Sequence, residues 1–359
     1  MDRRSESDRR PESDRRPESG GRPEPDRRPK SGRHARRTGI ITAVIAGIMV
    51  LGIGGIWYKE HQDAKRQEST ETSADESNII TWQGKKWRYN KNISNYLMIG
   101  VDKKEPVETQ VGSTEAGQAD AIFLLSVNRK TEKVTLISIP RDTMTEVESY
   151  DVQGKSLGKA VDHISLSYGY GDGGQKSCKL TQTAVSNLMY GLPIQGYLSL
   201  NMDGIPVLTS TVGGVTVTVP DDSLEASYPE FAEGAEVTLT AENSETFVRA
   251  RDVNVSQSAI NRMVRQQVYL DAFSQKAREC YEHNTAFAAS LYSALEPYTV
   301  TNVSEERLLS LFETVAKDED YTKWTIPGEG TQGASYDEYH VDDNALYEKI
   351  METFYQEVK

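Results

Sequence analysis

The sequence predicts an α/β protein: a single α/β/α domain with a central mixed sheet flanked by helices, preceded by a disordered tail and one transmembrane helix. Three observations predict it. Strand-like and helix-like segments alternate over residues 78–359, which is long enough to bury a substantial core. Residues 38–58 form an uncharged run, long enough to cross a bilayer. The chain before that run is polar and repetitive.

The tail comprises residues 1–37. Within it, residues 2–31 read as five successive hexads rich in Arg, Asp, Glu, Pro and Ser, without a large apolar residue. Such a segment cannot bury enough apolar surface to offset the conformational entropy that folding would cost. We therefore expect this Arg/Pro-rich tail to be disordered.

The uncharged run at residues 38–58 spans roughly 30 Å as a helix, which matches the hydrocarbon thickness of a membrane. It is longer than the apolar core of a signal peptide and ends in Trp57 and Tyr58, residue types common at the membrane interface. Arginines precede it at positions 33, 36 and 37. The positive-inside rule therefore predicts a single-pass protein of the cell membrane, with a cytoplasmic N-terminus and an extracytoplasmic domain beyond a polar stalk at residues 59–77.

Charge is divided unevenly along the chain. The net charge is −13, but residues 1–38 hold 13 basic and 8 acidic side chains, so that segment is basic by five and the remainder acidic by eighteen. A strongly acidic domain is a poor general binder of nucleic acid, so we expect no nucleic-acid partner.

The chain has two cysteines, Cys178 and Cys280, and both are predicted to lie outside the membrane. Oxidising conditions there permit a disulfide, so we expect the two to pair; the alternative is two buried thiols. Without histidines at ligand spacing, two cysteines do not form a zinc site.

The domain's elements follow from its apolar runs and turn residues. A hairpin is expected at residues 81–90, and strands at residues 95–102, 120–128, 133–139, 197–201, 214–219 and 321–327. Helical periodicity is found at residues 176–189, 203–211, 241–248, 259–281, 285–295, 305–317 and 342–358.

Acidic and basic residues stand at the ends of three of these strands. The first run ends in Asp102, the second begins with Asp120, and the third leads into Arg141 and Asp142. Strand ends and the loops after them are where α/β sheets build their sites. Asp102 and Asp120 could together hold Mg²⁺ or another divalent cation. The alternative for both aspartates is loop capping.

A basic stretch at residues 247–267 supplies further candidates. Arg249 and Arg251 are two residues apart, which in an extended segment places both on one side of the backbone. Arg262 and Gln266 are four apart, which places them on one helix face. Guanidinium groups bind phosphate oxygens in pairs, so this stretch is typical of a pyrophosphate site. The alternative is a solvated helix face.

With the strand-end carboxylates, this stretch favours metal-assisted phosphoryl transfer. The chain contains no G-x-S-x-G or H-E-x-x-H motif, which argues against a serine triad and a zinc hydrolase. The glycines at positions 169, 171 and 174 fit G-x-G-x-x-G, but no acid follows about 20 residues later, so we interpret them as a loop.

Several segments, in order behind one N-terminal membrane helix, resemble the LytR-CpsA-Psr family of cell-wall enzymes. They are NYLMIGVD at residues 95–102, QADAIFLLSVNRKTEKVTLISIPRDT at 118–143, GLPIQGYLSLNMDGIPVL at 191–208, GGVTVTVP at 213–220, FVRARD at 247–252 and NRMVRQQ at 261–267. The resemblance is closest over residues 95–267. It implies an α/β sheet flanked by helices, with an apolar pocket for a polyprenyl chain.

The resemblance also implies an activity: transfer of a glycopolymer, such as teichoic acid or capsule polysaccharide, from a polyprenyl-pyrophosphate carrier to peptidoglycan. The carrier-linked glycopolymer and peptidoglycan would be its partners. Asp102 and Asp120 would be the magnesium ligands. The pyrophosphate ligands would be Arg141, Arg249, Arg251, Arg262 and Gln266. The proton acceptor stays open between Asp120 and Asp142.

Two positions depart from the family pattern. The family usually has arginine two residues before the second aspartate, where this chain has Gln118, and many members have an acid within the region matching residues 253–261, where this chain has none. Three other functions therefore stay open: a hydrolase of the same lipid, a non-catalytic lipid or wall-polymer binding module, and a transcriptional regulator. The last would need a DNA-binding element in the short cytoplasmic tail.

Overall fold

A computed structural model describes residues 79–106, 108–113, 115–318 and 320–358. The predicted tail (1–37), membrane helix (38–58) and stalk (59–77) lie outside these residues. No helix within the described ranges is both long enough and apolar enough to span a bilayer.

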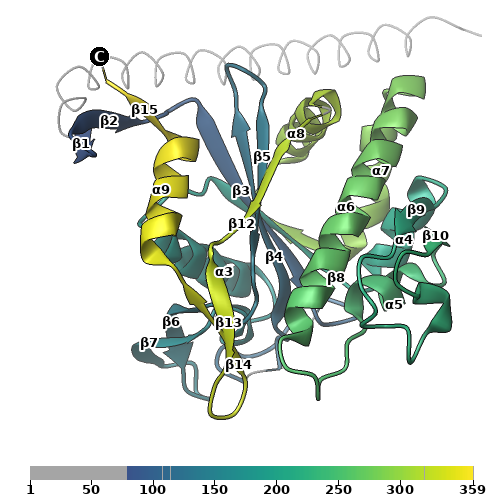
Figure 1. Ribbon diagram of the computed structural model, residues 1–359, viewed down its shortest axis with the longest axis horizontal. Helices are drawn as coiled ribbons and strands as arrows, with labels where there is room; N and C mark the ends of the chain where they lie inside the picture. The colour runs from purple at the N-terminus through teal and green to yellow at the C-terminus, as the bar shows by residue number, and fades with distance from the viewer. Residues whose placement is uncertain (1–78, 107, 114, 319, 359) are drawn as a thin grey trace, which may run out of the picture. The chain divides into compact units, whose positions relative to one another are not determined.

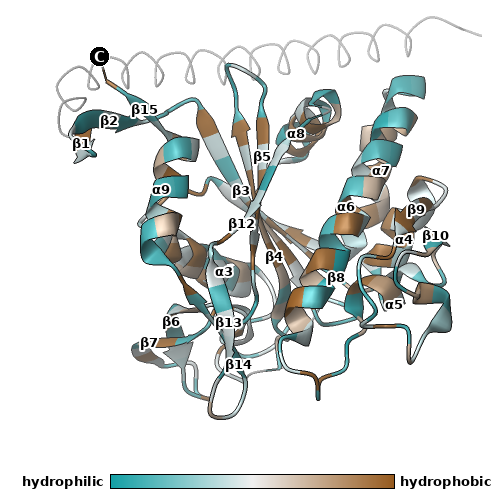
Figure 2. Ribbon diagram, viewed as in Figure 1, coloured by the Kyte–Doolittle hydropathy of each residue, from teal (hydrophilic) through white to brown (hydrophobic). Residues whose placement is uncertain are grey.

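The centre of the domain is a six-stranded sheet with the order β11-β8-β3-β4-β5-β12. Its strands are β3 (Ile93–Val101), β4 (Ala119–Asn128), β5 (Val134–Ile139), β8 (Gly196–Asn201), β11 (Thr299–Thr301) and β12 (Thr322–Thr325). β3 and β4, β4 and β5, and β8 and β11 pair antiparallel, whereas β3 and β8, and β5 and β12, pair parallel. This confirms the predicted mixed sheet. Figure 2 shows the hydrophobic residues concentrated on these strands, as expected when both faces are covered.

Helices cover the two faces of this sheet (Figure 1). On one side are α2 (Leu166–Gly169), α3 (Gln175–Leu188) and α9 (Asp343–Phe354). Their apolar residues join those of β3, β4 and β5 in the largest core cluster. On the other side are α6 (Ser258–His283), α7 (Phe287–Leu295) and α8 (Glu305–Lys317). Leu311 of α8 packs there against Tyr96, Val127 and Val134 of the sheet. The predicted three-layer arrangement is confirmed.

A second core cluster lies beside the sheet. It is built from α4 (Gly204–Thr211), β9 (Val215–Thr218), β10 (Glu236–Leu239), α5 (Ser244–Arg249), α6 and α7, with two short 3₁₀ turns at Pro229–Phe231 and Glu296–Tyr298. Phe231 and Phe247 meet edge to face at its centre, with ring centroids 5.3 Å apart. This contact fixes α5 against the 3₁₀ turn at Pro229–Phe231, and α5 carries the first arginine of the basic stretch.

Three smaller sheets complete the domain. β1 (Ile79–Trp82) and β2 (Lys85–Tyr89) form the predicted hairpin, and β15 (Tyr355–Glu357) adds to it where the sequence predicted the end of a helix. β6 (Met144–Tyr150) pairs with β7 (Ser156–His163), and β13 (Gly328–Gln332) pairs with β14 (Asp337–Val341). The last two hairpins were not predicted, because β7 and β13 are mostly exposed and lack the apolar alternation of a half-buried strand.

The predicted disulfide is wrong: Cys178 and Cys280 are both free thiols. Cys178 lies fully buried in α3, within the core cluster on that side of the sheet. Cys280 lies near the end of α6 and packs against the second core cluster. Each cysteine is therefore held by its own hydrophobic surroundings. Burial raises the pKa of the Cys178 thiol to about 11.

We expect iodoacetamide to modify Cys280 but not Cys178 in the folded protein at about pH 8, because the thiolate is the nucleophile and burial suppresses it at Cys178. Intact mass spectrometry of the full-length protein should show one adduct when folded and two after denaturation. A denatured, unreduced protein that takes up no reagent would instead demonstrate the disulfide.

Candidate active site

A β-bulge places Asp120 at the site. The register of β3 against β4 shifts so that Gly100 faces Ala121 while Val101 faces Ala119, which leaves Asp120 as the extra residue. A bulge interrupts the ladder and re-aims the side chain that it carries. A Cβ at position 100 would lie 2.9 Å from the Cβ of Ala121, so the close approach of the strands beside the bulge favours glycine.

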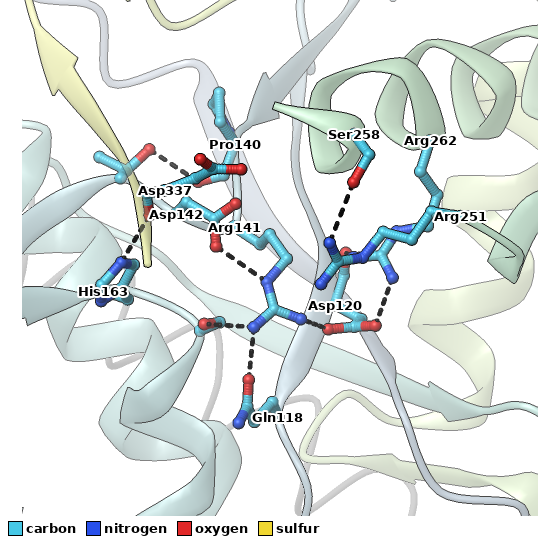
Figure 3. Close-up of polar contacts among 12 residues, drawn as sticks. Gln118, Asp120, Pro140, Arg141, Asp142, His163, Arg251, Ser258, Arg262 and Asp337 are labelled. Atoms are coloured by element: carbon cyan, nitrogen blue, oxygen red, sulfur yellow. Dashed lines mark hydrogen bonds and ion pairs between the residues drawn. The ribbon is translucent and has the colours of Figure 1, made fainter. Parts of the chain in front are cut away.

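The Asp120 carboxylate joins two guanidinium groups (Figure 3). One of its oxygens accepts a hydrogen bond from Nη1 of Arg141, and the other accepts from Nη1 of Arg262 at 2.7 Å. The three side chains are largely buried, with Arg262 only 5% exposed. One carboxylate thus neutralises only one of the two buried cations.

Arg141 extends this network. Its Nε donates to Oδ1 of Asp142 at 3.1 Å, and its Nη2 donates to Oε1 of Gln118 and to Oγ of Ser165. Burial lowers the pKa of Arg141, and the charge of Asp142 opposes that shift. The guanidinium stays protonated but is poorly solvated.

Arg262 is the most perturbed cation of the site. Burial and, after it, the neighbouring charge of Arg251 lower its pKa to about 10, against the opposing charges of Asp142 and Asp102. Its Nε is buried and has no partner among the described residues. Crowded, desolvated cations of this kind favour an incoming anion.

The structure also brings Arg249 and Arg251 to this region, though not as predicted. Arg249 is the last residue of α5 rather than part of an extended segment, and it is half exposed and paired with Glu245 at 3.3 Å. Arg251, beyond the helix end, donates to Oγ of Ser258 at 3.1 Å. Both arginines depress the pKa of Arg262, which places their charges close to it.

Gln266 and Arg265 hold the backbone of the same segment. Nε2 of Gln266 donates to the carbonyl of Val248 at 3.2 Å. Arg265, which is fully buried, donates to the carbonyls of Phe247 and Ala250. The residues just before Arg251 are therefore attached to α6 by two side chains.

Asp102 follows β3 at the same edge of the sheet. Its Oδ1 accepts the backbone N–H of Gln118 at 2.6 Å, which is the loop-capping role that the sequence left open. Gly117 in this turn has φ +89°, a conformation that favours glycine. The charge of Asp102 also acts on Arg262, so the aspartate belongs to the site as well.

Asp102 and Asp120 could hold Mg²⁺ only if further ligands, from phosphate and water, complete its coordination. Within the described ranges, no group of three His, Cys, Asp or Glu side chains could enclose a metal ion. Mg²⁺ is commonly held by one or two carboxylates while phosphate oxygens and water complete its six ligands. The pair fits that arrangement, although both Asp120 oxygens would share the metal with their arginine partners.

A second set of contacts, from β14, holds the loops around the cluster. The Asp337 carboxylate accepts from Oγ of Ser256 at 2.8 Å and from the backbone N–H of Gln257 at 2.6 Å, immediately before α6. The Asp337 carbonyl lies 2.8 Å from Nε2 of His163 (Figure 3). The backbone N–H of Tyr339 donates to the carbonyl of Asp142 at 2.8 Å. These contacts were not predicted from the sequence, because they join segments far apart in the chain.

Comparison with known proteins identifies the family. The LytR_cpsA_psr family model matches residues 55–354. The chain belongs to the LytR_cpsA_psr family.

Relatives and solved structures agree with this assignment. The polyisoprenyl-teichoic acid–peptidoglycan teichoic acid transferase TagU of Bacillus subtilis (strain 168) is 25% identical over 320 residues, covering 88% of this chain and 94% of TagU. The TagU protein of Halalkalibacterium halodurans is 30% identical over 183 residues, covering 51% of this chain and 53% of that protein. Two structures share the fold: "TagT bound to LI-WTA" (TM-score 0.56, 20% identity, 73% of this chain and 89% of that chain) and B. subtilis TagV (TM-score 0.55, 20% identity, 74% and 96%).

Gln118 stands where the family resemblance implies an arginine. Its side-chain oxygen accepts from Arg141, so the position still lines the cluster. An arginine there would face Arg141 with like charge, whereas the glutamine amide stabilises Arg141 by a hydrogen bond. The glutamine therefore adds a hydrogen bond to Arg141 without adding a positive charge.

A cavity at the ends of β3 and β8 is small. It has a volume of about 10 Å³ and is lined by residues that include Val101, Tyr168 and Asn201. That is room for about one water molecule. The cavity is too small for the polyprenyl chain that the family resemblance implies, so such a chain would bind elsewhere.

We expect Arg265→Leu to lower the free energy of unfolding by about 3 kcal/mol, because the substitution leaves buried carbonyls without donors. Urea unfolding of the purified full-length protein measures this. The matched control is Lys276→Ala on the same helix, which removes an exposed side chain and should leave the unfolding curve unchanged. Equal curves for Arg265→Leu and the wild type would rule out the positioning role of Arg265.

Proposed function

We propose that this protein is a membrane-anchored phosphotransferase that moves a glycopolymer from a polyprenyl-pyrophosphate carrier onto peptidoglycan. The observation that carries the proposal is the buried pair of Arg141 and Arg262 around Asp120, with Arg251 beside them. Family membership and a relative named as a teichoic acid transferase, matched over 94% of its length, support it.

The arginines would bind the pyrophosphate. Arg141, Arg251 and Arg262 together carry more positive charge than Asp120 neutralises, and each guanidinium can bind two phosphate oxygens. Arg249 is half exposed and held only by Glu245, so its side chain is free to exchange that exposed ion pair for a phosphate. Gln266 would contribute through the Val248 carbonyl that it holds rather than through the phosphate.

Asp102 and Asp120 would hold the magnesium ion. When bound, the ion would neutralise charge on the phosphate oxygens and make the phosphorus more electrophilic. Asp102 would keep its hydrogen bond to the Gln118 backbone through Oδ1 and would offer its other oxygen.

The reaction forms one P–O bond and breaks another. A hydroxyl oxygen of a peptidoglycan sugar attacks the phosphorus attached to the glycopolymer, and the bond to the bridging oxygen breaks, so polyprenyl phosphate leaves with that electron pair. Arg141, Arg251 and Arg262 stabilise the charge that develops on the leaving phosphate. The hydroxyl proton passes to a carboxylate. Asp142 suits this role better than Asp120, because both Asp120 oxygens are engaged by buried arginines while only Oδ1 of Asp142 is bonded to one.

The uncharged run at residues 38–58 would anchor the enzyme. With the N-terminus in the cytoplasm, the domain would face the cell wall, where lipid-linked glycopolymer and peptidoglycan meet. The stalk at residues 59–77 would connect the anchor to the domain.

The test uses the purified full-length protein with a short polyprenyl-pyrophosphate-linked saccharide, magnesium and uncrosslinked peptidoglycan. Mass spectrometry should detect a saccharide-phosphate adduct on the acceptor. Arg251→Ala and the Arg249→Ala, Arg251→Ala double variant should lower the rate by about 100-fold or more, because they remove preorganised cations from the leaving phosphate. Arg129→Ala, which removes an arginine just beyond the far end of β4, is the matched control and should keep the wild-type rate.

Three outcomes would contradict the proposal. Free saccharide phosphate without an adduct would identify a hydrolase of the same lipid. Binding of the lipid with no product would identify a binding module. Full activity of the double variant would show that the pyrophosphate binds elsewhere.

A further inference from the structure

A cleft separate from the candidate active site lies against α9. Its volume is about 470 Å³, within the range of small-molecule sites. Three aromatic residues line it (Trp82, Tyr190 and Tyr347), together with two carboxylates (Asp343 and Glu348) and the amide of Asn344. None of these residues belongs to the arginine cluster. In Figure 1, α9 and the β1–β2 hairpin lie on the other side of the central sheet from α6, which carries Arg262.

The aromatic rings that line this cleft are partly exposed to solvent. Tyr190 is 50% exposed, and its ring meets that of Tyr347 edge to face, with centroids 5.5 Å apart. Trp82 is braced in the same way by Trp87, with centroids 5.4 Å apart. These contacts fix the rings while leaving part of their surface open. Fixed, open aromatic surfaces are platforms on which the C–H face of a sugar ring can pack.

Two lining residues are held in an unfavourable backbone conformation. Tyr190 has φ +54° and Gln83 has φ +50°, the left-handed region that bulky L-residues rarely adopt. Strain of this kind is concentrated at functional sites. Glycine or asparagine would relieve it at position 190. The tyrosine instead places its ring in the cleft.

The polar groups of the cleft can form hydrogen bonds with hydroxyl and amide groups of a ligand. The hydroxyl of Tyr190 donates to Oδ1 of Asp343 at 2.8 Å, which orients the carboxylate. Burial raises the pKa of Tyr190 to about 12, so that hydroxyl keeps its proton at neutral pH. Carboxylates accept hydrogen bonds from sugar hydroxyl groups, and the side-chain amide of Asn344 can both donate and accept hydrogen bonds.

The negative charge of the cleft disfavours binding of phosphate-rich polymers. Its lining contains two carboxylates and no lysine or arginine. A phosphate-rich polymer would meet like charge there, whereas an uncharged saccharide would not. The cleft therefore differs from the arginine cluster in the ligand that it can accept.

We propose that this cleft binds a neutral glycan: a segment of two to four sugar rings that bears hydroxyl and acetamido groups. The aromatic rings would pack against the pyranose faces, and Asp343, Asn344 and Glu348 would bond the substituents. This proposal does not depend on the transfer reaction. In a wall enzyme, the cleft would add a second attachment to a polymeric substrate and so raise its effective concentration at the active site.

Isothermal titration calorimetry of the full-length protein with tetra-N-acetylchitotetraose tests the proposal. We expect saturable binding that Trp82→Ala and Tyr347→Leu each weaken by about tenfold or more. Tyr347→Leu keeps an apolar side chain at this position of α9, so it carries the test if Trp82→Ala does not fold. Tyr336→Ala is the matched control, because Tyr336 is an exposed tyrosine (76%) outside the cleft, and its affinity should equal that of the wild type.

Several results would overturn the proposal. One is the absence of saturable heat up to about 10 mM saccharide. Another is wild-type affinity in a folded Tyr347→Leu protein. A third is tighter binding of poly(glycerol phosphate) than of the neutral saccharide, lost in the cleft variants. Failure of the transfer assay alone would leave saccharide binding intact, so the two proposals can fail separately.

Discussion

The candidate site depends on one carboxylate held between two buried guanidinium groups. Asp120 comes from β4, Arg141 from the end of β5 and Arg262 from α6, so their contact joins both the sheet and the helix that covers it. Removing charges from water is costly, and a single carboxylate does not fully compensate two cations. Asp142 also pairs with Arg141, but the buried Nε of Arg262 has no partner among the described residues and Arg251 adds a further cation, which are properties that an anion site requires.

The rest of the domain keeps this cluster in place. The bulge in β4 turns Asp120 out of the ladder. Arg265 secures the backbone of the segment that carries Arg249 and Arg251, although it touches none of the three residues at the centre. Asp337, near the end of the chain, caps the start of α6. These residues serve the site by positioning others.

The sequence predicted the strands well where the local pattern was decisive. Continuous apolar runs before Asp102 and after Asp120 predicted β3 and β4, because strands covered on both faces lack polar alternation. The basic stretch likewise predicted which helix would carry Arg262. Local pattern could not show which of its arginines points inward. Arg265 is structural and Arg262 lies at the site, yet in sequence the two differ only by three positions along one helix.

The remaining features depend on contacts between distant segments. Asp120 and Arg262 are 142 residues apart, and the bulge that orients Asp120 arises from strand register rather than composition. The expected disulfide was wrong for the same reason. Nothing local to Cys178 or Cys280 indicated that they would join different core clusters. The β13–β14 hairpin, in which β13 is polar and exposed, is recognisable only from its pairing and from Asp337.

A double-mutant cycle between Asp120 and Arg262 tests most directly whether the carboxylate holds the site together. The free energy of unfolding would be measured for the wild type, Asp120→Asn, Arg262→Gln and the double variant. The account predicts a coupling energy of about 2 kcal/mol or more, because Asp120→Asn leaves the buried Arg262 without its counter-charge, a penalty that disappears when Arg262 is replaced as well. A coupling below about 0.5 kcal/mol would mean that the two groups act independently, and the proposed organisation of the site would be wrong.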